Sequence, residues 1–467
     1  MNTTLGVIFG NRDFFPDHLV NEARKDILAL FQEMNIDGVV LGENETKLGS
    51  VETYAHAKTC AELFKANRER IVGILVVLPN FGDEKGVADT IKLSGLNVPI
   101  LVQAYPDDLE AFNVERRRDA FCGKVSVCNN LRQYGYDFTL TSLHTSKPLS
   151  DSFKKDLTKF VSVCHVVKGL RSARLGAIGV RPGAFNTVRY SEKILQATGI
   201  TVTTVDLSEI LGNSNRLSDD ASQVKAKLDE IHAYAKHDTV PSSAIVRMAK
   251  LGVVISDWMQ ANDIQATALQ CWTSLQKNYG INACTLMSMM SNQLMPSACE
   301  TDITGVVSMY ALQLASDSPG ALVDWNNNYA DDPDRCVLFH CGNWAKSFIP
   351  DIEIKTAPIL GTTLGEENTY GAMAGRAVAG PMTYARVSTD DVHGIIRAYT
   401  GQGELTNDPL DTFGHRAVIH TPSLQKLLAY LCKSGFEHHV AMTMGSVSDA
   451  LDEAFTAYLG WENYKHS

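Results

Sequence analysis

Apolar runs alternate with segments of helical periodicity through the first hundred residues. The runs expected as strands cover residues 5–10, 36–42, 71–79 and 98–106, and the expected helices cover residues 18–34, 51–69 and 86–95. Strands without a polar face are typical of a parallel sheet that helices cover on both sides. The pattern therefore predicts a Rossmann- or flavodoxin-like α/β domain at the start of the chain.

A second α/β pattern begins after the charged stretch NVERRRDAF. The strands expected there cover residues 174–182 and 200–207, and the expected helices cover residues 151–173, 219–236 and 243–264. A strand that follows a helix and precedes another helix is the start of a βαβ unit. We expect a second parallel-sheet domain.

The pattern changes again after residue 350. Short segments that read as strands, broken by Gly and Pro turns, cover residues 352–365, 371–391, 394–405 and 415–422. Two helices are expected near the end, at residues 423–435 and 447–461. The fold class predicted is α/β: two Rossmann/flavodoxin-like parallel-sheet domains followed by a β-rich, barrel-like domain. The expected domain bounds are residues 1–115, 116–348 and 349–467.

Composition and charge narrow the class of protein. The chain has 467 residues, 45% hydrophobic and 20% charged, which is ordinary for a globular protein of two or three domains. Its formal charge of −11 argues against a nucleic-acid binder, which needs a basic face. We expect no membrane span, because no apolar run reaches roughly 18 residues. We expect no signal peptide either, since the start lacks a basic segment.

The ten cysteines are scattered, and none forms a CxxC motif. Most lie in apolar contexts, which is typical of reduced thiols in a cytoplasmic protein. Cys336 and Cys341 flank His340, so a thiolate zinc site is one possibility there. The carboxylates nearby are oxygen ligands better matched to manganese or magnesium.

Three groups able to hold a divalent cation lie in one window, residues 296–343. Glu300, Asp324 and His340 each follow an apolar run, 24 and 16 residues apart. Open α/β sheets bind their ligands at the carboxyl ends of strands, where such residues are expected. Each residue alone is more often a cap than a ligand, and the spacing is not a compact signature such as HExxH. The residues alone therefore indicate a metal site without establishing one.

Other candidates lie at expected strand ends and between the terminal helices. Arg12 stands in GNRDFFP, where a dinucleotide-binding protein would have GxGxxG. Gln270 and Trp272 are either a core pair or part of a pocket lining. His438 and His439 are adjacent on an expected irregular segment. One of them is therefore suited to ligate an ion, and the other to support the ligands of that ion.

Several segments are informative when they are taken together. They include PSACETDITGVVSMYALQL, LVDWNNN, LFHCGN, ATALQCW, RAYTGQGELTNDPLDTFG and GFEHHVAMTMGSVSDALDEAFTAYLGW. Together they resemble the L-fucose isomerase family and, more distantly, the L-arabinose isomerases. The match extends over nearly the whole chain and is specific only when the segments are taken jointly. The family fold is two α/β domains followed by a barrel-like domain, in agreement with the pattern above.

The resemblance implies an aldose–ketose isomerase that uses a divalent cation, usually Mn²⁺, with Mg²⁺ or Co²⁺ as alternatives. It implies Glu300 and Asp324 as catalytic residues and as metal ligands together with His439. The substrate contacts implied are Arg12, supplied by a neighbouring subunit of a homo-oligomer, and also Gln270, His340 and His438.

The substrate class stays open at this point. A neutral fucose- or arabinose-type sugar is the first expectation. A surplus of arginine near expected loops, at Arg12, Arg181 and Arg189, favours a sulfonated sugar such as sulfoquinovose as the alternative. A non-catalytic sugar-binding protein is a further alternative, and a dehydrogenase lacks its glycine motif.

Overall fold

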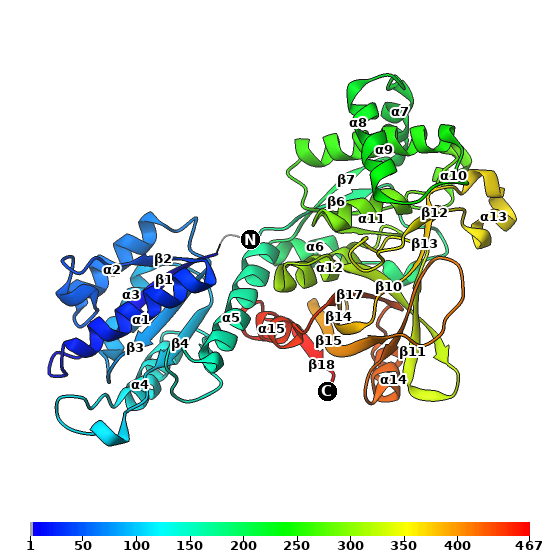
Figure 1. Ribbon diagram of the computed structural model, residues 1–467. Coiled ribbons are helices and arrows are strands. Elements are labelled where there is room, and N and C mark those ends of the chain that lie inside the picture. Colours follow the sequence, from blue (N-terminus) through cyan, green and yellow to red (C-terminus); the bar gives the residue numbers. More distant parts are fainter. Residues whose placement is uncertain (1–2) are drawn as a thin grey trace. The chain divides into compact units, whose positions relative to one another are not determined.

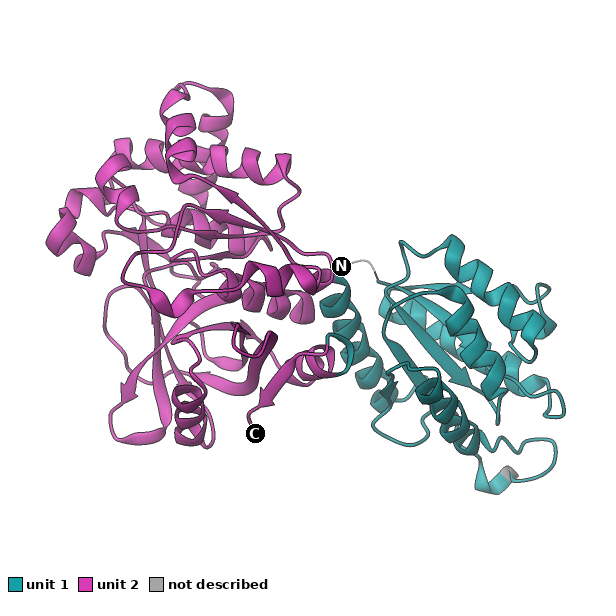
Figure 2. Ribbon diagram, turned by 180° about the vertical axis from the view of Figure 1, so that it is seen from behind, with its two compact units in different colours: residues 1–168, 457–459 teal, residues 169–456, 460–467 magenta. Residues whose placement is uncertain are grey.

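The computed structural model describes residues 3–467 of the chain. By compactness the chain divides into unit 1, Met1–Lys168 with Ala457–Leu459, and unit 2, Gly169–Thr456 with Gly460–Ser467 (Figure 2). The division into three domains drawn from the sequence stays a prediction. Within residues 3–467, no helix has both the length and the apolar character that a membrane crossing requires.

Unit 1 contains a five-stranded parallel sheet in the order β2-β1-β3-β4-β5, which is the flavodoxin order (Figure 1). Its central strands are buried along their whole length, as their continuous apolar runs predict. The strands are β1 (Thr3–Phe9), β2 (Ile36–Val40), β3 (Gly73–Leu78), β4 (Ile100–Ala104) and β5 (Thr139–Leu140). The helices are α1 (His18–Met34), α2 (Tyr54–Ala66), α3 (Glu84–Ser94), α4 (Ala120–Gln133) and α5 (Asp151–Leu170), with short 3₁₀ turns at Lys47–Gly49 and Leu109–Ala111.

Unit 2 begins with a second parallel sheet, in the order β7-β6-β8-β9. Its strands are β6 (Arg174–Ile178), β7 (Thr201–Val205), β8 (Ala266–Leu269) and β9 (Ser297–Ala298). The helices around it are α6 (Glu192–Ala197), α7 (Leu207–Arg216), α8 (Ser222–Tyr234), α9 (Ser242–Ala261), α10 (Ser274–Tyr279) and α11 (Cys284–Asn292), with a 3₁₀ turn at Asn186–Val188. The two predicted parallel sheets are thus confirmed.

A large mixed sheet follows, and part of it closes on itself. Six antiparallel strands pair in the order β16-β11-β10-β17-β14-β15, and β15 pairs again with β16, which completes a barrel. They are β10 (Ala321–Tyr329), β11 (Asp332–His340), β14 (Gly380–Asp390), β15 (Ile395–Thr406), β16 (His415–His420) and β17 (His439–Met444). The sheet is extended by β12 (Glu353–Lys355), β13 (Ala372–Arg376) and β18 (Glu462–Lys465).

The helices that accompany the barrel strands are α13 (Pro358–Leu364), α14 (Leu424–Ser434) and α15 (Ser448–Glu453), with a 3₁₀ turn at Glu366–Asn368 and a π-helical turn at Ala454–Tyr458. The barrel-like region predicted from the sequence is confirmed as a fold class. Its strands β10 and β11 lie before residue 349, so Asp324 and His340 are on antiparallel barrel strands and not, as expected from the sequence, at the carboxyl ends of parallel strands.

Helix α12 (Ile303–Ser316) links the two sheets of unit 2. It is buried on all sides except at its C-terminal turn and at Tyr310, and it packs against β8 and β9 of the parallel sheet and against β14 and β17 of the barrel. A helix that is apolar all round belongs inside a core. Its first residue, Ile303, follows the cap Asp302 and the turn that contains Glu300 and Thr301.

Three local predictions differ from the structure. The apolar run before Glu300 is mainly helix α11, because its Leu and Met residues are good helix formers and only Ser297 and Ala298 pair as a strand. Residues 358–364 are helical rather than extended, since Pro358 is suited to the first turn of a helix. His439 is the first residue of strand β17 and not part of an irregular segment.

Candidate active site

Glu300 lies in a strained turn between β9 and α12. Both Glu300 and Thr301 have a positive φ of 55°, which is uncommon for residues other than glycine and an outlier for a β-branched threonine. The N–H of Thr301 donates to the carbonyl of Leu269 at the end of β8, 3.2 Å away. Such strain persists only where the surrounding structure enforces it, and it is often found at functional sites.

The barrel register brings Asp324 to the same place. Asp324 on β10 is the direct partner of His439 on β17 and of Phe339 on β11, and His340 follows Phe339. Asp324 Oδ1 lies 3.5 Å from His439 Nε2, and Glu300 Oε2 lies 3.7 Å from the same nitrogen. The structure thus places one carboxylate oxygen of Glu300 and one of Asp324 near the same nitrogen of His439.

The two ring nitrogens of His439 have different partners. Nδ1 lies 2.8 Å from a carboxylate oxygen of Asp302, which can only accept, so Nδ1 carries the proton. This leaves the lone pair of Nε2 facing Glu300 and Asp324. A histidine held by a carboxylate in this way is the usual arrangement of a metal-ligating histidine.

His340 has the opposite arrangement. Its Nδ1 accepts the backbone N–H of Cys341 at 3.0 Å, so a neutral ring carries its proton on Nε2. That nitrogen faces Glu300 Oε2 at 3.7 Å. His438, which is more exposed, places Nε2 3.7 Å from Asp324 Oδ1. Of the three histidines, His439 is therefore the best oriented to ligate a hard cation.

Two buried carboxylate oxygens at this point lack a hydrogen-bond partner among the described residues, Glu300 Oε2 and Asp324 Oδ1. Burying a carboxylate oxygen without a partner is costly. Two carboxylate oxygens and one imidazole nitrogen are a donor set suited to a divalent cation such as Mn²⁺. Ligand atoms of Glu300, His340 and His439 lie within 4.8 Å of one another, as do those of Asp324, His438 and His439. The two groups share His439, and each offers a divalent cation one carboxylate and two imidazoles.

A buried network of charged residues holds His439 at its Nδ1 atom. Arg386 contacts both oxygens of Asp302, at 2.6 and 3.0 Å, and its Nε lies 3.2 Å from Glu437. Burial alone would raise the pKa of Asp302, but Arg386 and His439 outweigh it and hold that pKa well below its ordinary value. Asp302 therefore stays ionised and also caps α12 by accepting the N–H of Gly305 at 2.8 Å.

Aromatic residues close another side of the site. Trp272 Nε1 donates to Glu300 Oε1 at 2.9 Å. Phe185, in the loop after β6, packs edge-on against Trp272 and His438, with ring centroids 5.6 and 5.4 Å apart. Burial raises the pKa of Glu300 above its ordinary value, and the charges of His340 and His439 act against that shift.

A cavity of about 160 Å³ opens beside Glu300. Trp272 and Cys341 line it on the side of the site. Most of its other lining is apolar and includes Phe339, Ile359, Met373 and Phe413. Glu300 thus borders a largely apolar cavity.

The other predicted contacts lie elsewhere. Gln270 Oε1 accepts the N–H of Val180 at 3.0 Å, so this side chain holds the loop after β6. Arg12 belongs to unit 1, where it forms an ion pair with Glu84, donates to the carbonyl of Gly82 at 2.9 Å and stacks on Phe81. Their roles toward a substrate stay predictions.

Sequence reasoning did not identify the supporting residues Asp302, Arg386 and Glu437. One signal was present in the sequence. Arg386 stands in the apolar run MTYARVS, and an arginine in such a run is rarely buried unless it is paired. Its partners, 84 residues before it and 51 after it, are not recognisable by spacing.

Two family models match the chain. Residues 6–171 match the model described as "Fucose/sulfoquinovose isomerase, N-terminal domain", and residues 338–466 match "L-fucose isomerase, C-terminal domain". The chain belongs to the L-fucose isomerase-like family. The resemblance drawn from the motifs is confirmed, and with it the prediction of an aldose–ketose isomerase. The two matched ranges leave out residues 172–337, where Glu300 and Asp324 lie.

Relatives with curated names agree with the family. A sulfoquinovose isomerase of Priestia aryabhattai is 24% identical over 345 residues, which cover 72% of this chain and 74% of the relative. A sulfoquinovose isomerase of Clostridium sp. (strain MSTE9) is 22% identical over 339 residues, with the same coverage of both chains. A solved glucose-galactose binding protein from Geobacillus stearothermophilus, 12% identical, covers 60% of this chain and 83% of its own. Its TM-score of 0.17 is too low to bear on the fold.

Proposed function

We propose that this protein is a metal-dependent sulfoquinovose isomerase, which interconverts the open-chain aldose and its 2-ketose. The observation that carries the reaction type is the pair of partnerless buried oxygens, Glu300 Oε2 and Asp324 Oδ1, that face His439 Nε2. The relatives named as sulfoquinovose isomerases favour the sulfonated sugar over the neutral fucose- or arabinose-type sugar first expected from the sequence.

The cofactor proposed is Mn²⁺, held by Glu300, Asp324 and His439. When bound there, such a cation supplies positive charge that stabilises the oxygens of an enediolate as they become negative. The neighbouring His340 and His438 present ring nitrogens to Glu300 and Asp324 and are placed to donate to sugar hydroxyls.

Glu300 is the proposed base that removes the proton from C2 and returns it to C1. It lines the 160 Å³ cavity, and burial raises its pKa, so its carboxylate is a stronger base than an exposed one. The N–H of Trp272 donates to Oε1 and so fixes the orientation of this carboxylate. Asp324, whose side chain is 22% exposed, is the proposed shuttle for the proton between O1 and O2.

Two arginines are available for a sulfonate. Arg181 and Arg189 line a hollow of about 770 Å³ that also includes Thr301, next to Glu300. Among the described residues their hydrogen-bond partners are backbone carbonyls, those of Pro182 and Asn186. Arg12, in contrast, is already paired with Glu84. Arginine forks suit sulfonate oxygens, so we propose Arg181 and Arg189 as the groups that attract the anionic end of the substrate.

We also propose a homo-oligomer in which Arg12 of one subunit reaches the substrate of another, as the family resemblance implies. The proposed compartment is the cytoplasm, because all ten cysteines are free thiols.

The decisive experiment measures ketose formation from sulfoquinovose, L-fucose, D-arabinose, L-arabinose and L-rhamnose. The protein is stripped with EDTA, assayed, and assayed again after Mn²⁺ is restored. We expect turnover of sulfoquinovose that disappears with EDTA and returns with Mn²⁺. Turnover of a neutral sugar alone would show that this sugar, and not sulfoquinovose, is the substrate. Sugar binding without turnover and without metal dependence would favour a non-catalytic sugar-binding protein.

A further inference from the structure

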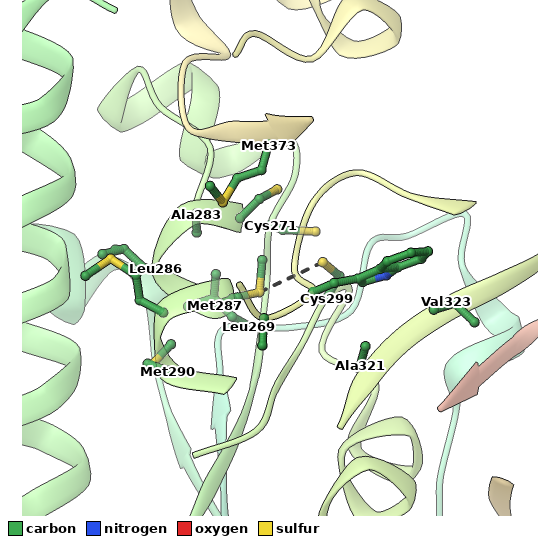
Figure 3. Packing of buried hydrophobic residues seen from close by; sticks show 14 of the residues in the cluster. Leu269, Cys271, Ala283, Leu286, Met287, Met290, Cys299, Ala321, Val323 and Met373 are labelled. Atoms are coloured by element: carbon green, nitrogen blue, oxygen red, sulfur yellow. Dashed lines mark hydrogen bonds between the residues drawn. The ribbon is translucent and has the colours of Figure 1, made fainter. Parts of the chain in front are cut away.

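Four cysteines from four separate segments meet beside the candidate active site. Cys271 follows β8, Cys284 begins α11, Cys299 follows β9 and Cys341 follows β11. The Sγ atom of Cys341 lies 3.5 Å from that of Cys284 and 3.8 Å from that of Cys299. Figure 3 shows Cys271 and Cys299 in this cluster with Met287, whose Sδ lies 3.9 Å from Cys299 Sγ.

An imidazole nitrogen faces the same sulfurs. His340 Nδ1 lies 3.4 Å from Cys341 Sγ, and the ligand atoms of Cys299, His340 and Cys341 all lie within 4.8 Å of one another. Nδ1 also accepts the N–H of Cys341 at 3.0 Å, so a cation bound by Nδ1 would take the place of that hydrogen bond. His340 thus presents one ring nitrogen to sulfur and the other to Glu300 Oε2.

The distances fit a metal site. Zinc–sulfur bonds of about 2.3 Å in a tetrahedral centre place neighbouring sulfurs about 3.8 Å apart. The sulfur–sulfur distances of 3.5 and 3.8 Å agree with that spacing. Cysteines that merely fill a core also touch at such distances, but a packing role does not require an imidazole nitrogen within 4.8 Å of two of the same sulfurs.

We propose that Cys299, Cys341 and His340 form a second metal site, which binds a thiophilic cation such as Zn²⁺. Soft thiolate ligands select such cations, whereas Glu300, Asp324 and His439 offer the harder set that suits Mn²⁺. On binding, each ligated thiol releases its proton to solvent, and the cation replaces the Cys341 N–H as the partner of His340 Nδ1.

The imidazole ring of His340 lies between the thiol site and the candidate active site. His340 Nε2 lies 3.7 Å from Glu300 Oε2, while Nδ1 faces the thiols. A cation on Nδ1 keeps the proton on Nε2 and fixes the ring beside Glu300. Occupancy of the thiol site is therefore expected to change the isomerase rate, although cation binding itself does not depend on the proposed function.

Co²⁺ is the probe that distinguishes the two sites, because only thiolate ligation gives an intense sulfur-to-cobalt charge-transfer band in the near ultraviolet. The full-length protein is saturated with Mn²⁺ and titrated with Co²⁺. We expect the band to saturate at one equivalent per chain and to vanish when Zn²⁺ is added. Cys299→Ala and Cys341→Ala should each weaken Co²⁺ binding at least about tenfold. The matched control is Cys336→Ala, a buried thiol on β11 outside the cluster, which should keep the band.

A measurement on the unaltered protein avoids variants that fail to fold. Zn²⁺ added to the Mn²⁺-saturated protein should slow alkylation of the half-buried Cys341, and leave the exposed Cys432 reacting at its original rate. Absence of a charge-transfer band, an unchanged affinity for Co²⁺ in Cys341→Ala, or alkylation of Cys341 at an unchanged rate would each overturn the second site. Those outcomes leave the isomerase proposal untouched, because none of them measures sugar turnover.

Discussion

At the scale of single residues, the site depends on two carboxylates with different surroundings. Glu300 is buried, held by Trp272 and placed by a strained turn, whereas Asp324 lies on a barrel strand and is partly exposed. Glu300→Gln and Asp324→Asn keep the shape and remove the charge. We expect each to lower kcat by 10²-fold or more, in line with the 10²–10⁴-fold typical of acid–base groups. Steady-state kinetics with Mn²⁺ in excess measures this, and the exposed Glu404→Gln on β15 is the control.

If both variants kept more than about a tenth of the original rate, the catalytic roles of Glu300 and Asp324 would be wrong. Circular dichroism spectra that match the unaltered protein are needed alongside, so that a lost fold is not taken for lost chemistry.

Asp302 is expected to position His439 through the carboxylate–imidazole hydrogen bond. Asp302→Asn removes the charge that holds Nδ1–H and leaves Arg386 with one carboxylate instead of two. We expect Mn²⁺ affinity to fall 10–100-fold, as for other residues that orient a metal ligand. The matched variant Glu437→Gln also removes one carboxylate from Arg386 but leaves the His439 contact in place.

Both variants should lower the free energy of unfolding by roughly 3–5 kcal/mol, because each breaks a buried ion pair. Only Asp302→Asn should change the dissociation constant for Mn²⁺, measured by calorimetry on folded protein. Equal losses of affinity in the two variants would show that Asp302 acts on stability alone.

At the scale of elements, strand β16 contains a histidine that is buried in its neutral form. Burial lowers the pKa of His415 to about 3, and its Nδ1 accepts the N–H of Trp344 at 3.1 Å. In the unfolded chain a histidine has a pKa near 6.5. Between these two values the unfolded chain binds a proton that the native protein does not, so stability falls as the pH falls.

His415→Asn keeps a hydrogen-bond acceptor near Nδ1 and removes the titration. From pH 7 to pH 5, the unaltered protein should lose about 2 kcal/mol more of its free energy of unfolding than the variant does. Urea unfolding at the two pH values measures the difference. A gap between the two proteins that stays constant with pH would contradict the buried neutral state of His415.

At the scale of the whole molecule, charge on the substrate should be recognised by unit 2. We expect Arg181→Gln with Arg189→Gln to raise KM for sulfoquinovose at least about tenfold, because each lost charge-assisted hydrogen bond costs about 1.5–3 kcal/mol. The neutral 6-deoxy analogue of the same sugar should show no such change. Arg216→Gln, an exposed arginine at the end of α7, serves as the control.

Sharing of the site between subunits has its own test. Arg12 lies in unit 1, whereas Glu300 and Asp324 both lie in unit 2. If Arg12 serves a neighbouring subunit, co-expressed Arg12→Ala and Glu300→Gln subunits should form some complete sites and regain activity. Co-expressed Glu300→Gln and Asp324→Asn subunits should regain none, because both substitutions fall in one site. Recovery in neither mixture would place Arg12 in the same site as its own Glu300.

Much of the fold and part of the site were predictable from the sequence, because they depend on local pattern. The periodicity at residues 18–34 matches α1, and the continuous apolar runs predicted the parallel strands β1, β3 and β4. Joint motif resemblance indicated the family and pointed to Glu300, Asp324 and His439. Helix and strand periodicity acts over a few residues, so a single sequence is enough to show it.

Tertiary structure alone decided the pairing of distant segments. Asp324 and His439 are neighbours because β10 and β17 pair in a register that no local pattern specifies. Arg386 and Asp302 meet because a barrel strand packs on the first turn of α12. The same packing gathers cysteines from four segments beside His340. The sequence shows which residues are apolar or charged. Only long-range packing determines which carboxylate, imidazole or thiol groups come into contact.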